Sequence, residues 1–126
     1  MSILDVKPML TVLNDNFSEE SQKIIFAINP ENATPLELWK KLDVISKEEM
    51  IDDIKMSSRD NFFVLYTDYS DEQAHEIYFF TKCQAVSFIS ENFDEEKEEG
   101  IDIVMCDDLY DVSYLGNHDG ILLKRK

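Results

Sequence analysis

The strongest candidate for catalysis in this sequence is a group of four aspartates around one predicted strand: Asp102, Asp107, Asp108 and Asp111. Carboxylate oxygens in such groups bind hard cations such as Mg²⁺, which would make the chain a metal-dependent hydrolase. Acidic residues are so frequent, at 27 of 126, that clusters of this size arise by chance. The spacing is therefore a weak signal, and metal-dependent hydrolysis is the less favoured alternative.

Other catalytic patterns are missing from the sequence. The chain has three glycines, which are too few for a glycine-rich phosphate-binding loop. His75 and His118 lack the spacing that places two metal ligands on one helix face. We therefore predict a protein that is not an enzyme and that has neither a metal site nor a cofactor.

The chain has a formal net charge of −15, and its acidic residues concentrate between residues 68 and 119. This stretch holds 15 acidic residues against two basic ones, Lys82 and Lys97. Six of the acids fall within residues 91–99, where we predict a helix. Like charges four residues apart destabilise a helix by about 0.2–0.5 kcal/mol per pair, and acids at its C-terminal end oppose its dipole. A local rule broken in this way often marks a functional surface; the alternative is that the high net charge only keeps the protein soluble.

An acidic surface of this density predicts a basic protein partner. A small, acidic, motif-poor chain has the profile of a bacterial immunity protein, so we predict a non-catalytic inhibitor that binds a basic, nuclease-type toxin. The expected partner-binding residues are acids of this stretch together with two tyrosine anchors: Tyr69, Asp71, Glu72, Glu91, Asp94, Glu95, Glu98, Glu99, Asp107, Asp108, Tyr110 and Asp111. A nucleic-acid mimic that blocks a DNA-binding enzyme is the alternative. We expect a monomer or a weak homodimer.

The same charge argues against other partners, because it repels the phosphate backbone of nucleic acids and anionic membrane surfaces. The longest apolar runs have five residues, far short of the roughly 20 that a membrane-spanning helix needs. The N-terminal residues lack the basic and apolar regions of a secretory signal. Cys83 and Cys106 are expected to be reduced, at least partly buried thiols. We predict a soluble, cytoplasmic protein.

The elements that position these residues are predicted from hydrophobic spacing and capping signals. A loose helical stripe runs from Leu4 to Leu13, and residues 19–28 begin with acids that suit a first helical turn. Capping boxes at Thr34–Glu37 and Ser46–Glu49 start two further short helices, the first of which is expected to extend to Leu42.

The second half predicts mainly strands. Residues 62–67 and 77–80 are aromatic and β-branched, which predicts an antiparallel hairpin with a loop at 68–76. A capping box at Thr81–Gln84 starts a helix that is expected to run to Glu99 and stop at Gly100. Further strands are expected in three places: 101–106, 109–115 and 121–124, the last after a turn at 116–120. Residues 1–126 are thus predicted to form a single α+β domain, with N-terminal helices followed by a mostly antiparallel sheet of about four or five strands and one further helix packed on it.

Overall fold

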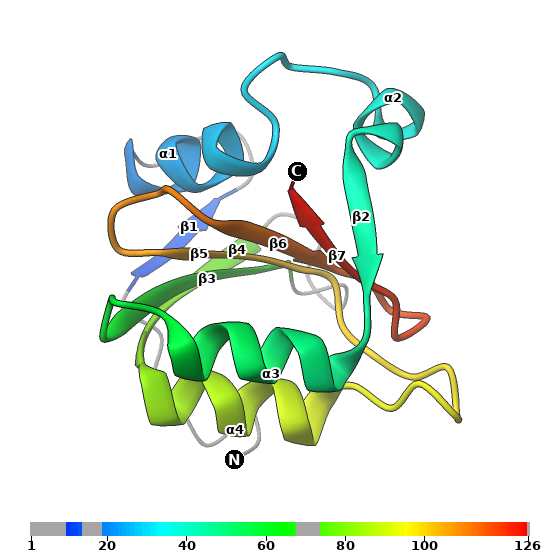
Figure 1. The fold of residues 1–126 in the computed structure, drawn as a ribbon. Helices are drawn as coiled ribbons and strands as arrows, with labels where there is room; N and C mark the ends of the chain where they lie inside the picture. Colours follow the sequence, from blue (N-terminus) through cyan, green and yellow to red (C-terminus); the bar gives the residue numbers. More distant parts are fainter. Residues whose placement is uncertain (1–9, 14–18, 68–73, 126) are drawn as a thin grey trace.

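Seven strands form one antiparallel sheet in the computed structural model, which describes residues 10–13, 19–67 and 74–125. The elements along the chain are β1 (Leu10–Leu13), α1 (Glu19–Ile28), α2 (Pro35–Lys40), β2 (Leu42–Ile45), α3 (Lys47–Met56), β3 (Asn61–Thr67), β4 (Ala74–Thr81), α4 (Lys82–Asn92), β5 (Ile103–Asp107), β6 (Ser113–Gly116) and β7 (Leu122–Arg125). The strand order is β1-β4-β3-β5-β6-β7-β2, so β1 and β2 are the edges. This arrangement confirms the predicted α+β class, with more strands than expected (Figure 1).

Side chains alternate along the strands and divide the core between the two faces of the sheet. On β3, Val64 packs with the residues of α3 and α4, whereas Leu65 packs with Ile24 of α1. Figure 1 shows α3 and α4 together on one side of the sheet and α1 on the other. The larger core lies under α3 and α4 and contains many fully buried side chains: Met50, Ile54, Phe80, Phe88, Ile89, Phe93 and Met105. Each such side chain contributes about 1.5–3 kcal/mol, so this layer is the main source of stability.

The opposite face is covered by α1. Ile24 packs against Ile77 and Cys106 of the sheet, and the buried Ser113 hydroxyl donates a hydrogen bond of 3.0 Å to the carbonyl of Ala27. This bond satisfies a hydroxyl group that would otherwise be buried without a partner. Helix α1 is therefore fixed to β6 by a polar contact as well as by apolar packing.

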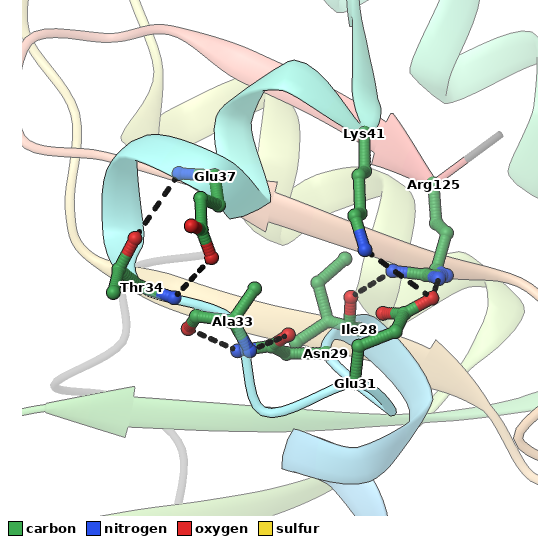
Figure 2. A network of polar contacts seen from close by, with 8 residues as sticks. All are labelled: Ile28, Asn29, Glu31, Ala33, Thr34, Glu37, Lys41 and Arg125. Carbon is green, nitrogen blue, oxygen red and sulfur yellow. Dashed lines mark hydrogen bonds and ion pairs between the residues drawn. The ribbon is translucent and has the colours of Figure 1, made fainter.

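The segment between α1 and α2 is tied to the last strand by Arg125 (Figure 2). The Arg125 guanidinium donates to the carbonyl of Ile28 at 2.8 Å and to the Glu31 carboxylate at 2.6 Å. Lys41 approaches the same carboxylate at 3.8 Å. Within the segment, the Asn29 side chain both accepts from the N–H of Ala33 and donates to its carbonyl. A basic residue near the end of the chain is thus paired inside the fold.

The capping signals define the starts of α2, α3 and α4. The Thr34 and Thr81 hydroxyls each accept from the backbone N–H three residues later, and their own backbone N–H groups donate to the Glu37 and Gln84 side chains, which confirms both capping boxes. Ser46 also caps its helix by accepting from the N–H of Glu49 at 3.0 Å. There the Glu49 carboxylate accepts from the Ser46 hydroxyl at 3.3 Å. The predicted helix starts are correct at all three positions.

Several predicted elements are wrong at the edges of the sheet. Leu10–Leu13 form a strand rather than part of a helix because they pair with β4, Leu10 opposite Ile77; the rest of that stripe lies outside the described residues. Leu42 begins β2 instead of ending α2, since β2 pairs along its length with β7. The described part of the predicted 68–76 loop, residues 74–76, belongs to β4.

The strand predicted at 109–115 is shorter than expected and begins at Ser113. Residues 108–110 form a turn in which Tyr110 donates its N–H to the carbonyl of Asp107 at 3.1 Å and adopts a φ of 60°. The prediction for the two thiols is correct for Cys106, which is buried, and wrong for Cys83, which is exposed. Cys83 lies in the first turn of α4, outside the face that packs on the sheet.

Candidate functional site

Residues 94–99, called the acidic hairpin from here on, form a tight turn and not the end of a helix. Helix α4 stops at Asn92, and Asp94 and Glu99 exchange backbone hydrogen bonds of 2.8 and 3.0 Å. The Asp94 carboxylate accepts from the N–H groups of Glu96 and Lys97. Glu98 adopts a φ of 54°, which closes the turn. The predicted helix to Glu99 is therefore wrong.

Ending the helix early removes the repulsion that a longer helix would have imposed. The acids would stand one turn apart on a helix and would oppose its dipole, whereas residues 94–99 form a turn outside the helix. The C-terminal end of α4 is instead capped by a cation from α3, because the Lys47 ammonium donates to the carbonyls of Ser90 at 3.2 Å and Phe93 at 2.9 Å. The carbonyl groups at the C-terminal end of α4 are thus paired with a lysine.

Close packing holds the acidic hairpin against the sheet and the β6–β7 turn. Phe93, immediately before it, is only 2 % exposed. A Cβ atom at Gly116 would lie 2.6 Å from the Phe93 ring, so only glycine leaves room for it. Gly120 has a φ of 81° and passes so close to the Glu99 carbonyl that a Cβ there would lie 2.9 Å from that oxygen. Gly100, the remaining glycine of the chain, donates its N–H to the carbonyl of His118 at 3.1 Å.

One carboxylate of the acidic hairpin also holds it to α3. The Glu95 carboxylate accepts a short hydrogen bond from the backbone N–H of Lys47, the first residue of that helix. An anion at a helix N-terminus is stabilised by the unpaired N–H groups and by the helix dipole. Glu95 is therefore both a surface acid and a structural contact.

An open groove of about 690 Å³ lies between the acidic hairpin, the β6–β7 turn and the edge strand β2. We call it the acidic groove, and it is lined by Val44, Ile45, Ser46, Glu95, Glu98, Asp119, Gly120, Ile121 and Leu122. A second hollow adjoins it and shares Ser46 and Glu95 with it, adding three more acids and one lysine: Glu48, Asp94, Glu96 and Lys47. The two hollows together form a surface on which acids outnumber the single lysine, beside apolar residues of β2.

The carboxylates of the acidic hairpin have no cationic partner within the described ranges. The ion pairs formed there by lysine and arginine use acids elsewhere, namely Glu31, Asp53 and Asp108. The exposed His118 imidazole lies 3.7 Å from the Asp119 carboxylate. In the part of the chain that the structure describes, the acids of the groove therefore form no ion pair with a lysine or arginine.

The structure brings together only some of the residues that the sequence indicated. Asp94, Glu95 and Glu98 lie at the acidic groove and its neighbouring hollow. Glu99 is exposed in the hairpin, and Glu91 is exposed in the last turn of α4. Tyr69, Asp71 and Glu72 lie outside the described residues. The sequence prediction missed Glu48, Glu96 and Asp119. Asp119 lies beside Gly120 within the turn predicted at residues 116–120.

The other predicted site residues lie at the far end of the β5–β6 hairpin and make contacts within the chain. Asp107 is 4 % exposed and accepts from the N–H of Asp111 at 2.8 Å. Asp108 forms a two-bonded ion pair with Arg59, at 2.6 and 3.1 Å. The Arg59 hydrogen bonds hold the pKa of Asp108 below its usual value. The charge of Asp108 is thus already compensated.

Tyr110, one of the two predicted anchors, belongs to the same end of the sheet. Its ring stacks on Phe63 with centroids 5.6 Å apart, and burial raises the pKa of its hydroxyl. Tyr110 also lines a shallow hollow with Phe26 of α1, on the face of the sheet opposite to α3 and α4. It therefore does not border the acidic groove.

The four aspartates considered for metal-dependent hydrolysis do not meet. Asp102 precedes β5 and lies 3.1 Å from the His118 imidazole, whereas Asp107, Asp108 and Asp111 follow at the other end of that strand. Across the described ranges, no three His, Cys, Asp or Glu side chains are grouped as metal ligands. The geometry therefore gives no support to that alternative.

No family model, curated protein or solved structure that was compared with this chain matches it. No relative therefore suggests an activity or a partner, and a function has to be inferred from the surface. Among the described residues, none of the helices has the length and apolar character required to cross a membrane.

Proposed function

We propose that this protein is a non-catalytic binding protein that engages a basic protein partner through the acidic groove. The observation that supports this proposal is a set of carboxylates around a concave surface that outnumber the two lysines near them, Lys47 and Lys97, and form no ion pair with a lysine or arginine in the described ranges. Packing around Phe93 and the Glu95 contact to α3 fix these positions. The electrostatic free energy of such a surface is lowered more by a cationic partner than by water and salt.

The partner class that fits best is a nuclease-type toxin. An enzyme that cleaves nucleic acid presents a cationic surface to the phosphate backbone. An acidic protein that covers this surface excludes the substrate, so inhibition needs no chemistry of its own. Opposite charges also steer the encounter and raise the association rate to as much as about 10⁸–10⁹ M⁻¹s⁻¹ at low salt. Rapid association suits an immunity protein, which must act before the toxin does.

The test uses charge reversal at two groove acids that make no structural hydrogen bond through their carboxylates, Glu98→Lys with Asp119→Lys. Glu95 is left unchanged because its carboxylate also caps α3. Unit charges about 7 Å apart in water interact by about 0.6 kcal/mol. Reversing both acids changes the local charge by four units, and screening reduces the resulting loss of attraction by about half. We expect association with the partner to slow about tenfold at low salt.

The matched control is Asp111→Lys, which makes the same type of charge change at the far end of the β5–β6 hairpin. The partner is captured from a lysate of the source cells on the immobilised protein at low salt, released at high salt and then used in kinetic and nuclease assays. We expect one dominant basic protein whose nuclease activity is suppressed at equimolar ratio by the wild type and by Asp111→Lys. Equal rates for all variants, or full nuclease activity in the presence of the inhibitor, would refute the proposal. Capture of several unrelated DNA-binding proteins would identify a nucleic-acid mimic instead.

A further inference from the structure

The acidic groove combines carboxylates with apolar side chains on one concave surface. Three of the residues that line it are acids, and four are apolar, namely Val44, Ile45, Ile121 and Leu122. Val44 is 72 % exposed, and Ile45 and Ile121 are half-buried, so apolar surface stays in contact with water beside the acids. A cation without an apolar part would leave this surface in water. The lining therefore fits a ligand that is cationic at one end and aliphatic along its length.

Two acids of the groove, Glu98 and Asp119, come from segments of the chain that touch. A Cβ atom on Gly120 would lie 2.9 Å from the carbonyl oxygen of Glu99 and 3.2 Å from its nitrogen, and Glu98 and Asp119 directly precede these two residues. Within the described ranges, neither acid forms an ion pair with a lysine or arginine. Carboxylates from two neighbouring segments thus border the same groove.

We infer that the acidic groove receives an arginine side chain of the partner. This inference rests on the proposed function and names the group that is recognised. Arginine joins an aliphatic stem to a planar guanidinium with several N–H donors. The stem packs on the apolar lining, while the guanidinium donates to the carboxylates of Glu98 and Asp119. A lysine ammonium is a compact and more strongly hydrated charge, so the groove favours arginine over lysine.

The probe for this inference is butylguanidinium, which carries the arginine head group on a four-carbon chain. It is added to the isotope-labelled wild-type protein at low, constant ionic strength. Nuclear magnetic resonance follows the amides of Glu98 and Asp119 and the methyl groups of Val44, Ile45 and Ile121. We expect saturable shifts at the two amides and nuclear Overhauser contacts between the butyl chain and at least one of these methyl groups.

The length of the chain tests the apolar lining. Each methylene group that leaves water completely strengthens binding by up to about fourfold. With each methylene about half covered in an open groove, the gain is about twofold per group. Butylguanidinium should therefore bind about eightfold more tightly than methylguanidinium, which has three fewer methylene groups.

Further ligands and variants test the head group. Butylurea, a neutral analogue of similar shape, should bind at least about tenfold more weakly than butylguanidinium, and butylammonium at least about threefold more weakly. Glu98→Gln with Asp119→Asn should weaken butylguanidinium at least about fivefold. The matched control Asp111→Asn neutralises an exposed acid at the far end of the β5–β6 hairpin and should keep the affinity within about twofold of the wild type.

Two kinds of result would overturn the inference and leave the proposed function standing. The first is equal binding of methylguanidinium and butylguanidinium, or of butylammonium and butylguanidinium, because charge alone would then explain the attraction. The second is binding of butylguanidinium outside the groove, or no binding at all, while a captured partner still binds there. The proposed function itself fails on a different result, namely equal association rates of the partner with all charge-reversal variants.

Discussion

Gly116→Ala is the sharpest test of how the acidic hairpin is held, and it needs no partner. A Cβ atom at residue 116 would lie 2.6 Å from Cζ of Phe93 and 3.0 Å from Cγ1 of Ile103. Neither neighbour has free space, because Phe93 and Ile103 are both buried in the core under α3 and α4. Overpacking of this kind usually costs about 1–3 kcal/mol. We expect Gly116→Ala to lower the free energy of unfolding by about 2 kcal/mol.

A second substitution shows whether the cost comes from the Phe93 ring. Phe93→Leu alone removes part of a buried ring and should cost about 1–2 kcal/mol. In the double variant the smaller side chain leaves room for the new methyl group. The two costs should therefore fail to add, and the double variant should be at least about 1 kcal/mol more stable than their sum predicts. The free energy of unfolding of all four proteins is measured by urea denaturation followed by far-ultraviolet circular dichroism. The values can be compared if the free energy depends equally steeply on urea concentration in each protein.

A structural readout connects this packing to the candidate site. Because Phe93 directly precedes the acidic hairpin, its displacement in Gly116→Ala should shift the amide resonances of residues 94–99. Leu115→Ala is the matched control, since Leu115 lies on the same strand but packs with Leu123 on the opposite face. It should lower stability by about 1–2 kcal/mol and leave those resonances in place. A Gly116→Ala protein within about 0.5 kcal/mol of the wild type, or costs that add within about 0.5 kcal/mol, would refute the described packing.

Two further predictions concern groups whose pKa the fold shifts. Hydrogen bonds from Arg59 lower the pKa of Asp108 below its ordinary value of 3.8, so the stability from this pair is present above that value and is lost as pH falls through the lower pKa of the folded state. The difference in urea midpoint between the wild type and Arg59→Gln should accordingly be constant near neutral pH and disappear in acid; a difference that persists there would contradict the assignment. Burial, with a smaller contribution from the nearby Asp107 charge, raises the pKa of the Cys106 thiol to about 12, whereas Cys83 is exposed. Ellman's reagent at pH 8 should therefore label one thiol rapidly in the native protein and the second only in urea, and Cys83→Ser should abolish the rapid phase.

The elements that the sequence predicted correctly are those whose signals lie within a few residues of one another. The capping boxes at Thr34 and Thr81 bring donor and acceptor together within one helical turn, so these few residues are enough to predict where the helix begins. The aromatic and β-branched runs of β3 and β4 are similar, because each run of neighbouring residues favours a strand by itself. The α+β class follows from these elements alone.

The edge strands lack such a local signal. β2 is only four residues long, follows α2 without an intervening glycine or proline, and becomes a strand by pairing with β7, about 80 residues later in the chain. Leu10–Leu13 likewise become a strand by pairing with β4. Pairing over such separations is a tertiary effect that overrides local preference. The acidic groove includes β2, so its full outline was not accessible from the sequence.

The acidic run was misinterpreted for a different reason. Ala85, Phe88, Ile89 and Phe93 recur at helical intervals, and Phe93 is buried as this spacing suggests, but with an extended backbone of φ −127° and ψ 128°. Burial of its ring fixes where the chain leaves the helix. The repulsion calculated for a helix through residues 94–99 was evidence against the helix. A cost that a chain can avoid by a local change of conformation is usually avoided.

The way in which the acidic hairpin is fixed bears directly on what its charges can do. Elsewhere in the described structure, ion pairs join distant elements, as Arg125 does with Glu31 and Lys124 with Asp53, and each pair compensates an acid. The hairpin is held by its own backbone hydrogen bonds, by the packing of Phe93 against Gly116 and by a single carboxylate contact from Glu95. Lys47 binds the Phe93 carbonyl at the start of the hairpin and Lys97 lies within it, but in the described ranges neither forms an ion pair with the hairpin carboxylates, so the loop has a defined shape and keeps most of its negative charge. A defined shape combined with negative charge is what the proposed binding to a basic partner requires.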